Sequence, residues 1–134
     1  MGLKFVPKVK VTDKHSLAVV YTPGVAAACL KIVENQDAAF DYTNRENTVG
    51  VFAQKYENAL KRAEFLKNAL NIDAVPLEIN TENAEEIKFV VENLEPTFGA
   101  IDLSLLSEFV KEISFEVKIP VLTGQTDNLK EFFL

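Results

Sequence analysis

The residue types that most often carry out chemistry are scarce in this chain of 134 residues. His15 is the single histidine, so one chain cannot assemble a histidine-based triad or a multi-histidine metal site. Cys29 is the single cysteine and lies in an apolar run, which favours a small buried thiol over a reactive one. No G-x-G-x-x-G run occurs, so we expect no nucleotide-binding domain and no bound dinucleotide cofactor in the chain.

Composition narrows the class of protein and its partners. Hydrophobic residues make up 48% and charged residues 25%, which predicts one globular domain over residues 1–134. The formal net charge of -6 opposes binding to phosphate backbones, so we expect no nucleic-acid partner. No apolar run reaches the ~20 residues that cross a bilayer, and the start lacks a signal-peptide core. We therefore expect no membrane contact and a cytoplasmic location.

The elements that must position any site alternate between strand and helix patterns. This order predicts a three-layer α/β domain with a short, mostly parallel sheet and right-handed crossovers. The predicted strands cover residues 48–53, 74–79, 100–103 and 119–122, and the predicted helices cover residues 24–33, 56–71, 81–93 and 104–113.

Several residues predict how these elements begin and where they lie. Pro76 cannot donate to a ladder, which places its strand at an edge or makes Pro76 a strand end. Thr81 and Ser104 are suited to cap the helices that follow them. Lysines alternate with other residues from Lys4 to Lys14, a pattern typical of one solvated strand face.

Four segments carry a resemblance to a known family. They are LAVVYTPGVAAACLKI (17–32), DYTNRENTVGV (41–51), ALKRAEFLKNALNIDAVPLEINTEN (59–83) and LEPTFGAIDL (94–103). In order and spacing they resemble the N-terminal, substrate-side domain of prokaryotic-type malic enzymes. The resemblance implies the fold of that domain. It also implies an ancestry in enzymes that oxidise malate with NAD or NADP and decarboxylate the product with Mg²⁺ or Mn²⁺.

The resemblance assigns two positions to proton transfer. Tyr21 matches the family's general acid, although a tyrosine with a wet hydroxyl that only packs at a helix entrance fits equally well. Arg62 stands where the family has its lysine base, and a guanidinium stays protonated and cannot act as a base. Arg62 is therefore expected to bind a carboxylate at most, or to be a solvated helix residue. A slip of one residue would place Lys61 at that position instead.

The family's metal ligands are not matched. The resemblance places the acidic ligands at positions that here hold Ser104, Leu105, Gly124 and Gln125. A hard divalent cation requires convergent oxygen ligands, so we expect no metal in the chain. A displaced site formed by Asp102, Glu108 and Asp127 is a weaker alternative.

These observations leave three hypotheses about function. The first is a stand-alone, non-catalytic domain that acts as a binding or subunit-interaction module, as a homo-oligomer and by family analogy a homodimer. The second is the substrate-side component of a malate oxidoreductase that works with a separate nucleotide-binding subunit. The third is a small-carboxylate sensor that uses Tyr21 and Arg62. The apolar end NLKEFFL, with Leu129, Phe132 and Phe133, is expected to dock on its own core or on another subunit.

Overall fold

The structure is a computed structural model that describes residues 3–21 and 23–124. The chain divides into two compact units, Met1–Asn44 and Arg45–Leu134. We name them the helical unit and the sheet unit. The predicted apolar docking of the end NLKEFFL falls outside the described residues.

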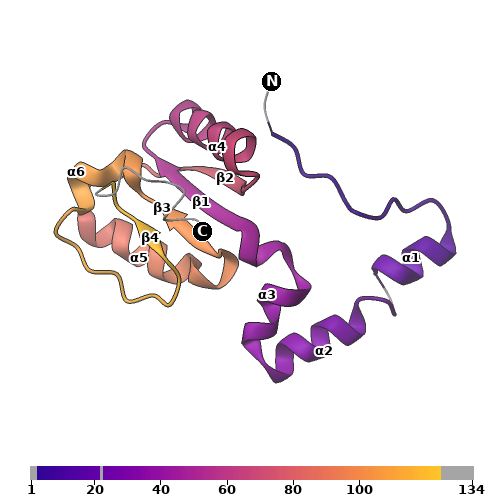
Figure 1. Ribbon diagram of the computed structural model, residues 1–134. Coiled ribbons are helices and arrows are strands. Elements are labelled where there is room, and N and C mark those ends of the chain that lie inside the picture. The colour runs from indigo at the N-terminus through magenta and orange to yellow at the C-terminus, as the bar shows by residue number, and fades with distance from the viewer. Residues whose placement is uncertain (1–2, 22, 125–134) are drawn as a thin grey trace. The chain divides into compact units, whose positions relative to one another are not determined.

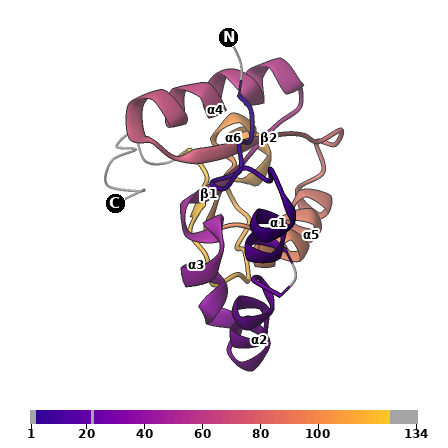
Figure 2. The same ribbon diagram turned by 90° about the vertical axis from the view of Figure 1, so that its right-hand side faces the viewer.

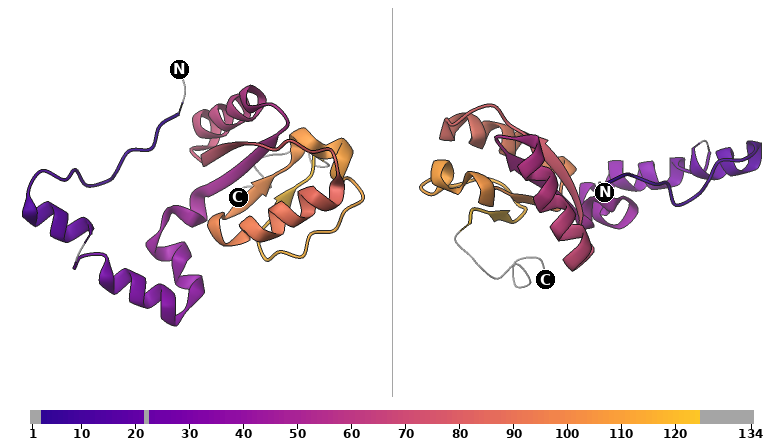
Figure 3. Two further views of the ribbon diagram at one scale, coloured as in Figure 1. Left: turned by 180° about the vertical axis from the view of Figure 1, so that it is seen from behind. Right: turned by 90° about the horizontal axis from the view of Figure 1, so that it is seen from above.

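The helical unit consists of short helices that bury no side chain completely. Its helices are α1 (Lys14–Val20), α2 (Ala26–Glu34) and α3 (Ala39–Tyr42), with the 3-10 turn η1 (Gln36–Ala38) between α2 and α3. Residues 3–12 form neither helix nor strand (Figure 3). The predicted strand face from Lys4 to Lys14 is therefore wrong, because no strand of the described residues pairs with this segment and its C-terminal end turns into α1.

Helix α1 was absent from the sequence-based predictions, yet its start has a clear local cause. Asp13 is the N-cap, and its Oδ1 accepts a hydrogen bond from Ser16 N at 2.8 Å. Ser16 Oγ in turn accepts from Asp13 N at 3.1 Å, which completes a capping box. The hydrogen bond from the Ser16 backbone lowers the pKa of Asp13. The spacing of these two residues was the signal that would have revealed the helix.

Helix α2 confirms the helix predicted over residues 24–33 but not the fate of its thiol. Cys29 is exposed, whereas its apolar surroundings in the sequence had suggested burial. The reason is that Cys29 lies in a unit with no core, so an apolar neighbourhood along the chain does not become an apolar neighbourhood in space.

The sheet unit is an α/β fold with four parallel strands in the order β2-β1-β3-β4. The strands are β1 (Thr48–Ala53), β2 (Asp73–Glu78), β3 (Ala100–Asp102) and β4 (Val121–Leu122), and the two long helices are α4 (Tyr56–Leu70) and α5 (Ala84–Leu94). The chain leaves β1 for β2 in one direction and crosses back to β3 in the other. Right-handed crossovers therefore place α4 and α5 on opposite faces of the sheet, as Figure 1 shows. The predicted three-layer arrangement with a parallel sheet is confirmed.

Alternate residues of β1 build the two sides of the core. Val49, Val51 and Ala53 pack with the apolar stripe of α4, which includes Ala59, Ala63 and Leu66. Figure 2 shows α4 lying along β2 on this side. On the other side Phe98 lies against Gly50, where an added Cβ would come within 3.1 Å of its ring. A glycine therefore allows the close approach of this ring.

The ends of the elements refine the predictions. Pro76 lies in β2, which is an edge strand, as predicted. Thr81 is not the cap of α5, because the side chain of Asn83 accepts from Glu85 N and Glu86 N. Ser104 does not cap a long helix either. It begins the 3-10 turn η4 (Ser104–Leu106), which continues into the short helix α6 (Ser107–Val110).

The remaining 3-10 turns are η2 (Asn44–Asn47) and η3 (Glu95–Thr97). Arg45 fixes the segment around η3, since its Nη2 donates to Glu95 O at 3.0 Å and its Nε donates to Phe98 O at 3.2 Å. None of the helices in residues 3–21 and 23–124 combines the length and the apolar character needed to cross a bilayer.

Candidate functional site

The candidate site lies at the carboxyl ends of β1 and β3. The strand order reverses between these two strands, since α4 leaves β1 toward one edge while β3 lies on the other side of β1. In open α/β sheets such a reversal leaves a crevice outside the carboxyl ends of the strands, where ligands bind. Here α4 contributes one side of the crevice and η4 the other.

A buried ion pair closes the floor of this crevice. Arg62, in the second turn of α4, donates from Nε to Asp102 Oδ2 at 2.8 Å. The Asp102 side chain is fully buried at the end of β3, and that of Arg62 is 21% exposed. The other carboxylate oxygen accepts from Ser104 N at 2.9 Å. Asp102 thus has partners on both oxygens, and Arg62 binds a carboxylate of its own chain.

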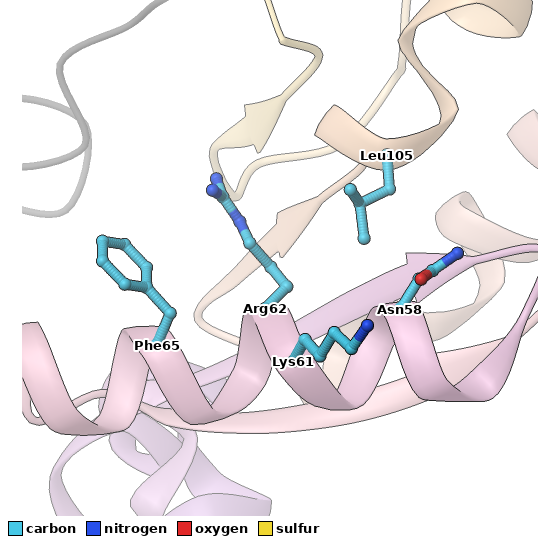
Figure 4. A pocket seen from close by; sticks show the side chains of 5 residues that line it. All are labelled: Asn58, Lys61, Arg62, Phe65 and Leu105. Atoms are coloured by element: carbon cyan, nitrogen blue, oxygen red, sulfur yellow. The ribbon is translucent and has the colours of Figure 1, made fainter.

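Beside this pair lies an open pocket of about 420 Å³, which we call the α4 pocket. Its lining residues are Asn58, Lys61, Arg62, Phe65 and Leu105. Figure 4 shows the side chains of Arg62 and Phe65 rising from α4 and that of Leu105 projecting toward them from η4. Lys61 runs along α4 toward Asn58. The pocket therefore combines two cationic side chains with two apolar ones.

A second pocket of about 240 Å³ adjoins the first and shares Asn58 and Leu105 with it. It is also lined by Lys55 and Glu108, so it holds one cation and one anion. Glu108, one of the three residues of the predicted displaced metal site, thus lines this pocket together with Lys55.

The residues of the site fit a divalent metal poorly. Leu105 offers no oxygen ligand, and Asp102 already binds Arg62 and Ser104 N. Within the described part of the chain, no three His, Cys, Asp or Glu side chains gather as a potential metal site. Asp127 and Gln125 lie outside the described residues. No chemical step can be derived through a metal from these groups.

Tyr21 lies in the helical unit, whereas Arg62 lies in the sheet unit. Tyr21 is the C-cap residue of α1, its N–H donates to Leu17 O at 2.9 Å, and its side chain is 65% exposed. Its predicted role as a proton donor stays a prediction. Lys61, the alternative to Arg62, is exposed and lines the α4 pocket.

Sequence reasoning missed the role of Asp102. It treated this residue as a metal-ligand candidate, whereas the structure makes it the partner of Arg62. The available signal was an acidic residue that ends a short buried strand, because a fully buried carboxylate requires a cation or several donors. Nothing in the sequence identified which of the fourteen basic residues would supply that cation.

Comparison with known proteins gives a consistent relationship. Residues 3–65 match the sequence profile of the malic enzyme N-terminal domain. The bifunctional malic/malolactic enzyme of Bacillus subtilis is 32% identical, and the match covers 85% of this chain and 32% of the relative. Other relatives are NAD-dependent and NADP-dependent malic enzymes.

Solved structures show the same fold. The NAD-dependent malic enzyme of Thermotoga maritima matches with a TM-score of 0.73 and 29% identity, over 90% of this chain and 37% of that one. The malic enzyme of Pyrococcus horikoshii matches with a TM-score of 0.78 and 24% identity, over 90% and 32% respectively. The chain spans about a third of the length of these relatives. By sequence and by fold, the chain belongs to the malic enzyme family, in the part that forms the family's N-terminal domain.

Proposed function

We propose that this chain is a non-catalytic malic enzyme N-terminal domain that pairs with a second copy of itself through its helical unit. The observation that carries the proposal is the ion pair between Arg62 and Asp102. Arg62 stands at the position that the resemblance assigns to the family's base. Its guanidinium holds the carboxylate of Asp102 and cannot accept a proton.

The chemistry around this pair supports the absence of turnover. A base for malate oxidation must release its proton near neutral pH, which a guanidinium cannot do. Ser104 and Leu105, at the positions of the family's acidic pair, offer at most one hydroxyl to a metal. The Ser104 Oγ is itself buried without a hydrogen-bond partner among the described residues. A crevice that offers neither a proton-accepting base nor a set of metal ligands favours a binding role over a catalytic one.

The apolar surface of the helical unit supports self-association. Large apolar side chains there remain exposed, including Leu17, Val19, Val25, Leu30 and Val33. Exposed apolar groups at this density are typical of interaction surfaces. The unit holds five lysines against four acidic residues, a net charge of +1. The sheet unit holds nine basic against sixteen acidic residues, a net charge of -7, so two copies repel there and meet more readily through their helical units.

Light scattering after size exclusion tests the pairing. We expect the full chain to elute as a dimer, and Leu30→Glu to elute as a monomer because a charge would be placed in the apolar interface. Phe89→Glu is the matched control, since Phe89 on α5 is 68% exposed and Leu30 is 63% exposed. A monomer at high concentration, or a dimer that tolerates Leu30→Glu, would contradict the proposal.

A second assay tests the lack of catalysis. The full chain is mixed with malate, Mn²⁺ and NAD or NADP, alone and with candidate nucleotide-binding subunits. We expect no reduced cofactor under any of these conditions. Reduction by the chain alone would overturn the proposal, and reduction only with a second subunit would show it to be an enzyme component instead.

A further inference from the structure

We propose that the α4 pocket binds an amphipathic monocarboxylate, with its carboxylate on Lys61 and Arg62 and its aromatic or branched apolar body on Phe65 and Leu105. The inference goes beyond the proposed function, because pairing of two copies requires no ligand. It also differs from the small-carboxylate hypothesis in its ligand and in its independence from Tyr21.

The positive charge of the α4 pocket favours an anionic ligand. Lys61 and Arg62 both line the pocket, and no acidic side chain of residues 3–21 and 23–124 does. Asp102 compensates one of the two positive charges through the Arg62 Nε. Lys61 has no ion-pair partner among the described residues. One uncompensated positive charge beside the pocket matches a ligand with a single negative charge.

The second argument is the hydrogen-bonding capacity of Arg62. A guanidinium carries five N–H donors, and the bond to Asp102 uses the one on Nε. The four donors on the Nη atoms have no partner in residues 3–21 and 23–124, while the buried pair holds the guanidinium in place. A group that is already fixed loses little freedom when it binds an anion, which favours recognition by the outer edge of Arg62.

The third argument is the apolar lining. Phe65 is 49% exposed and Leu105 is 44% exposed, and their side chains approach the pocket from opposite sides (Figure 4). A small polar dicarboxylate such as malate would leave both side chains in water and would bring one charge too many. An aromatic or branched-chain body covers both, and removal of this surface from water adds to the affinity.

The neighbouring pocket does not offer the same match. The formal charges of its lysine and its glutamate, Lys55 and Glu108, sum to zero. An anion is therefore expected to place its carboxylate in the α4 pocket, where the positive charge is not compensated.

The test is titration of the full chain with 3-phenylpropionate, followed by calorimetry and by backbone amide NMR. For a ligand of this size we expect a dissociation constant on the order of 1 mM. Signals of residues 58–65 and 104–106 should shift. Malate and the neutral analogue 3-phenylpropanamide should bind at least about 5-fold more weakly. Malate lacks the apolar body, and the amide lacks the negative charge.

Paired variants locate the site. Lys61→Gln and Phe65→Ala should each weaken 3-phenylpropionate by about 3- to 5-fold. Their matched controls, Lys111→Gln and Phe89→Ala, alter exposed residues outside the pocket and should change nothing. Light scattering on the same samples reports pairing separately, so failure of the ligand does not mimic failure of the dimer. Malate or the amide binding as tightly as 3-phenylpropionate, no saturable binding, or equal effects of variants and controls would overturn the inference.

Discussion

The helical unit and the sheet unit follow different rules within one chain. Every buried residue among the described residues belongs to the sheet unit, where all six residues of β1 are buried. The helical unit has well-formed helices, a capping box on α1 and no buried side chain among residues 3–21 and 23–44. Local hydrogen bonds are thus enough to define helices, but a core is needed to stabilise a fold on its own. We expect the helical unit to gain that burial through the pairing proposed above.

The largest expected effect comes from breaking the buried pair of the sheet unit. Arg62→Met leaves Asp102 charged and buried without its cation, which should lower the free energy of unfolding by about 3–5 kcal/mol. Urea denaturation measures this loss. The double variant Arg62→Met/Asp102→Asn should recover most of it, while Lys61→Met, at an exposed neighbour, should have little effect. Equal losses in the single and double variants would show that the arginine matters for packing rather than for charge.

A core substitution sharpens the comparison between the units directly. Leu66→Ala removes a fully buried side chain from α4 and should lower the free energy of unfolding by about 2–5 kcal/mol. Leu30→Ala in the helical unit, measured at low protein concentration, should change it by less than about 0.5 kcal/mol. Similar losses at both positions would mean that the helical unit has a core of its own.

The two helix caps form the next pair. Asn83→Ala removes the side chain that accepts from Glu85 N and Glu86 N, at a cost of about 1 kcal/mol in urea. Asp13→Ala removes the corresponding cap of α1 and should lower the helical circular dichroism without moving the urea midpoint of the sheet unit. A shift of that midpoint by Asp13→Ala would indicate that the two units unfold together.

The smallest effect concerns pH. Lys67 Nζ donates to Asp73 Oδ1 at 2.9 Å and lowers the pKa of Asp73. In the unfolded state Asp73 has an ordinary pKa of ~3.9, so that state binds more protons than the folded state as pH falls. The stabilisation by the pair is therefore complete above this value and is lost as pH falls through the lower folded pKa. Because both groups are more than a third exposed, the contribution should not exceed about 0.5 kcal/mol. Urea titrations of Lys67→Met from pH 7 to pH 2.5 should show a smaller loss of stability on acidification than the unaltered chain.

The alternation of strands and helices in the sheet unit could be predicted from its sequence, but the order of the strands in the sheet could not. The helix predicted over residues 104–113 is limited to η4 and α6. The apolar stripe of α4 and the short apolar strands have the periodicities that burial on one or two faces requires, and Pro76 correctly indicated an edge. The errors lie at helix starts. Thr81 and Asn83 have equally suitable side chains, and the backbone path alone selects Asn83. Ser104 lost its expected role because Asp102, two residues earlier, accepts from its N–H.

The candidate site was predicted only in part. Arg62 was selected through the family resemblance, and its inability to act as a base follows from its side chain alone. Its partner Asp102 stands forty residues away, so no local pattern connects the two. The predicted burial of Cys29 and the predicted strand face from Lys4 to Lys14 were wrong. Burial depends on a core and a strand face depends on a neighbouring strand, and neither can be read from the local sequence.

The chemistry open to Arg62 and Leu105 follows from the sequence alone, because a guanidinium and an aliphatic side chain keep their properties wherever they lie. The order of strands and helices in the sheet unit is also readable from the sequence, since periodicity is a local property. By contrast, the contact of Arg62 with Asp102 and the shared pocket of Phe65 and Leu105 depend on the folded chain. These contacts join residues about forty positions apart, and their proximity exists only once β1 and β3 lie side by side in the sheet.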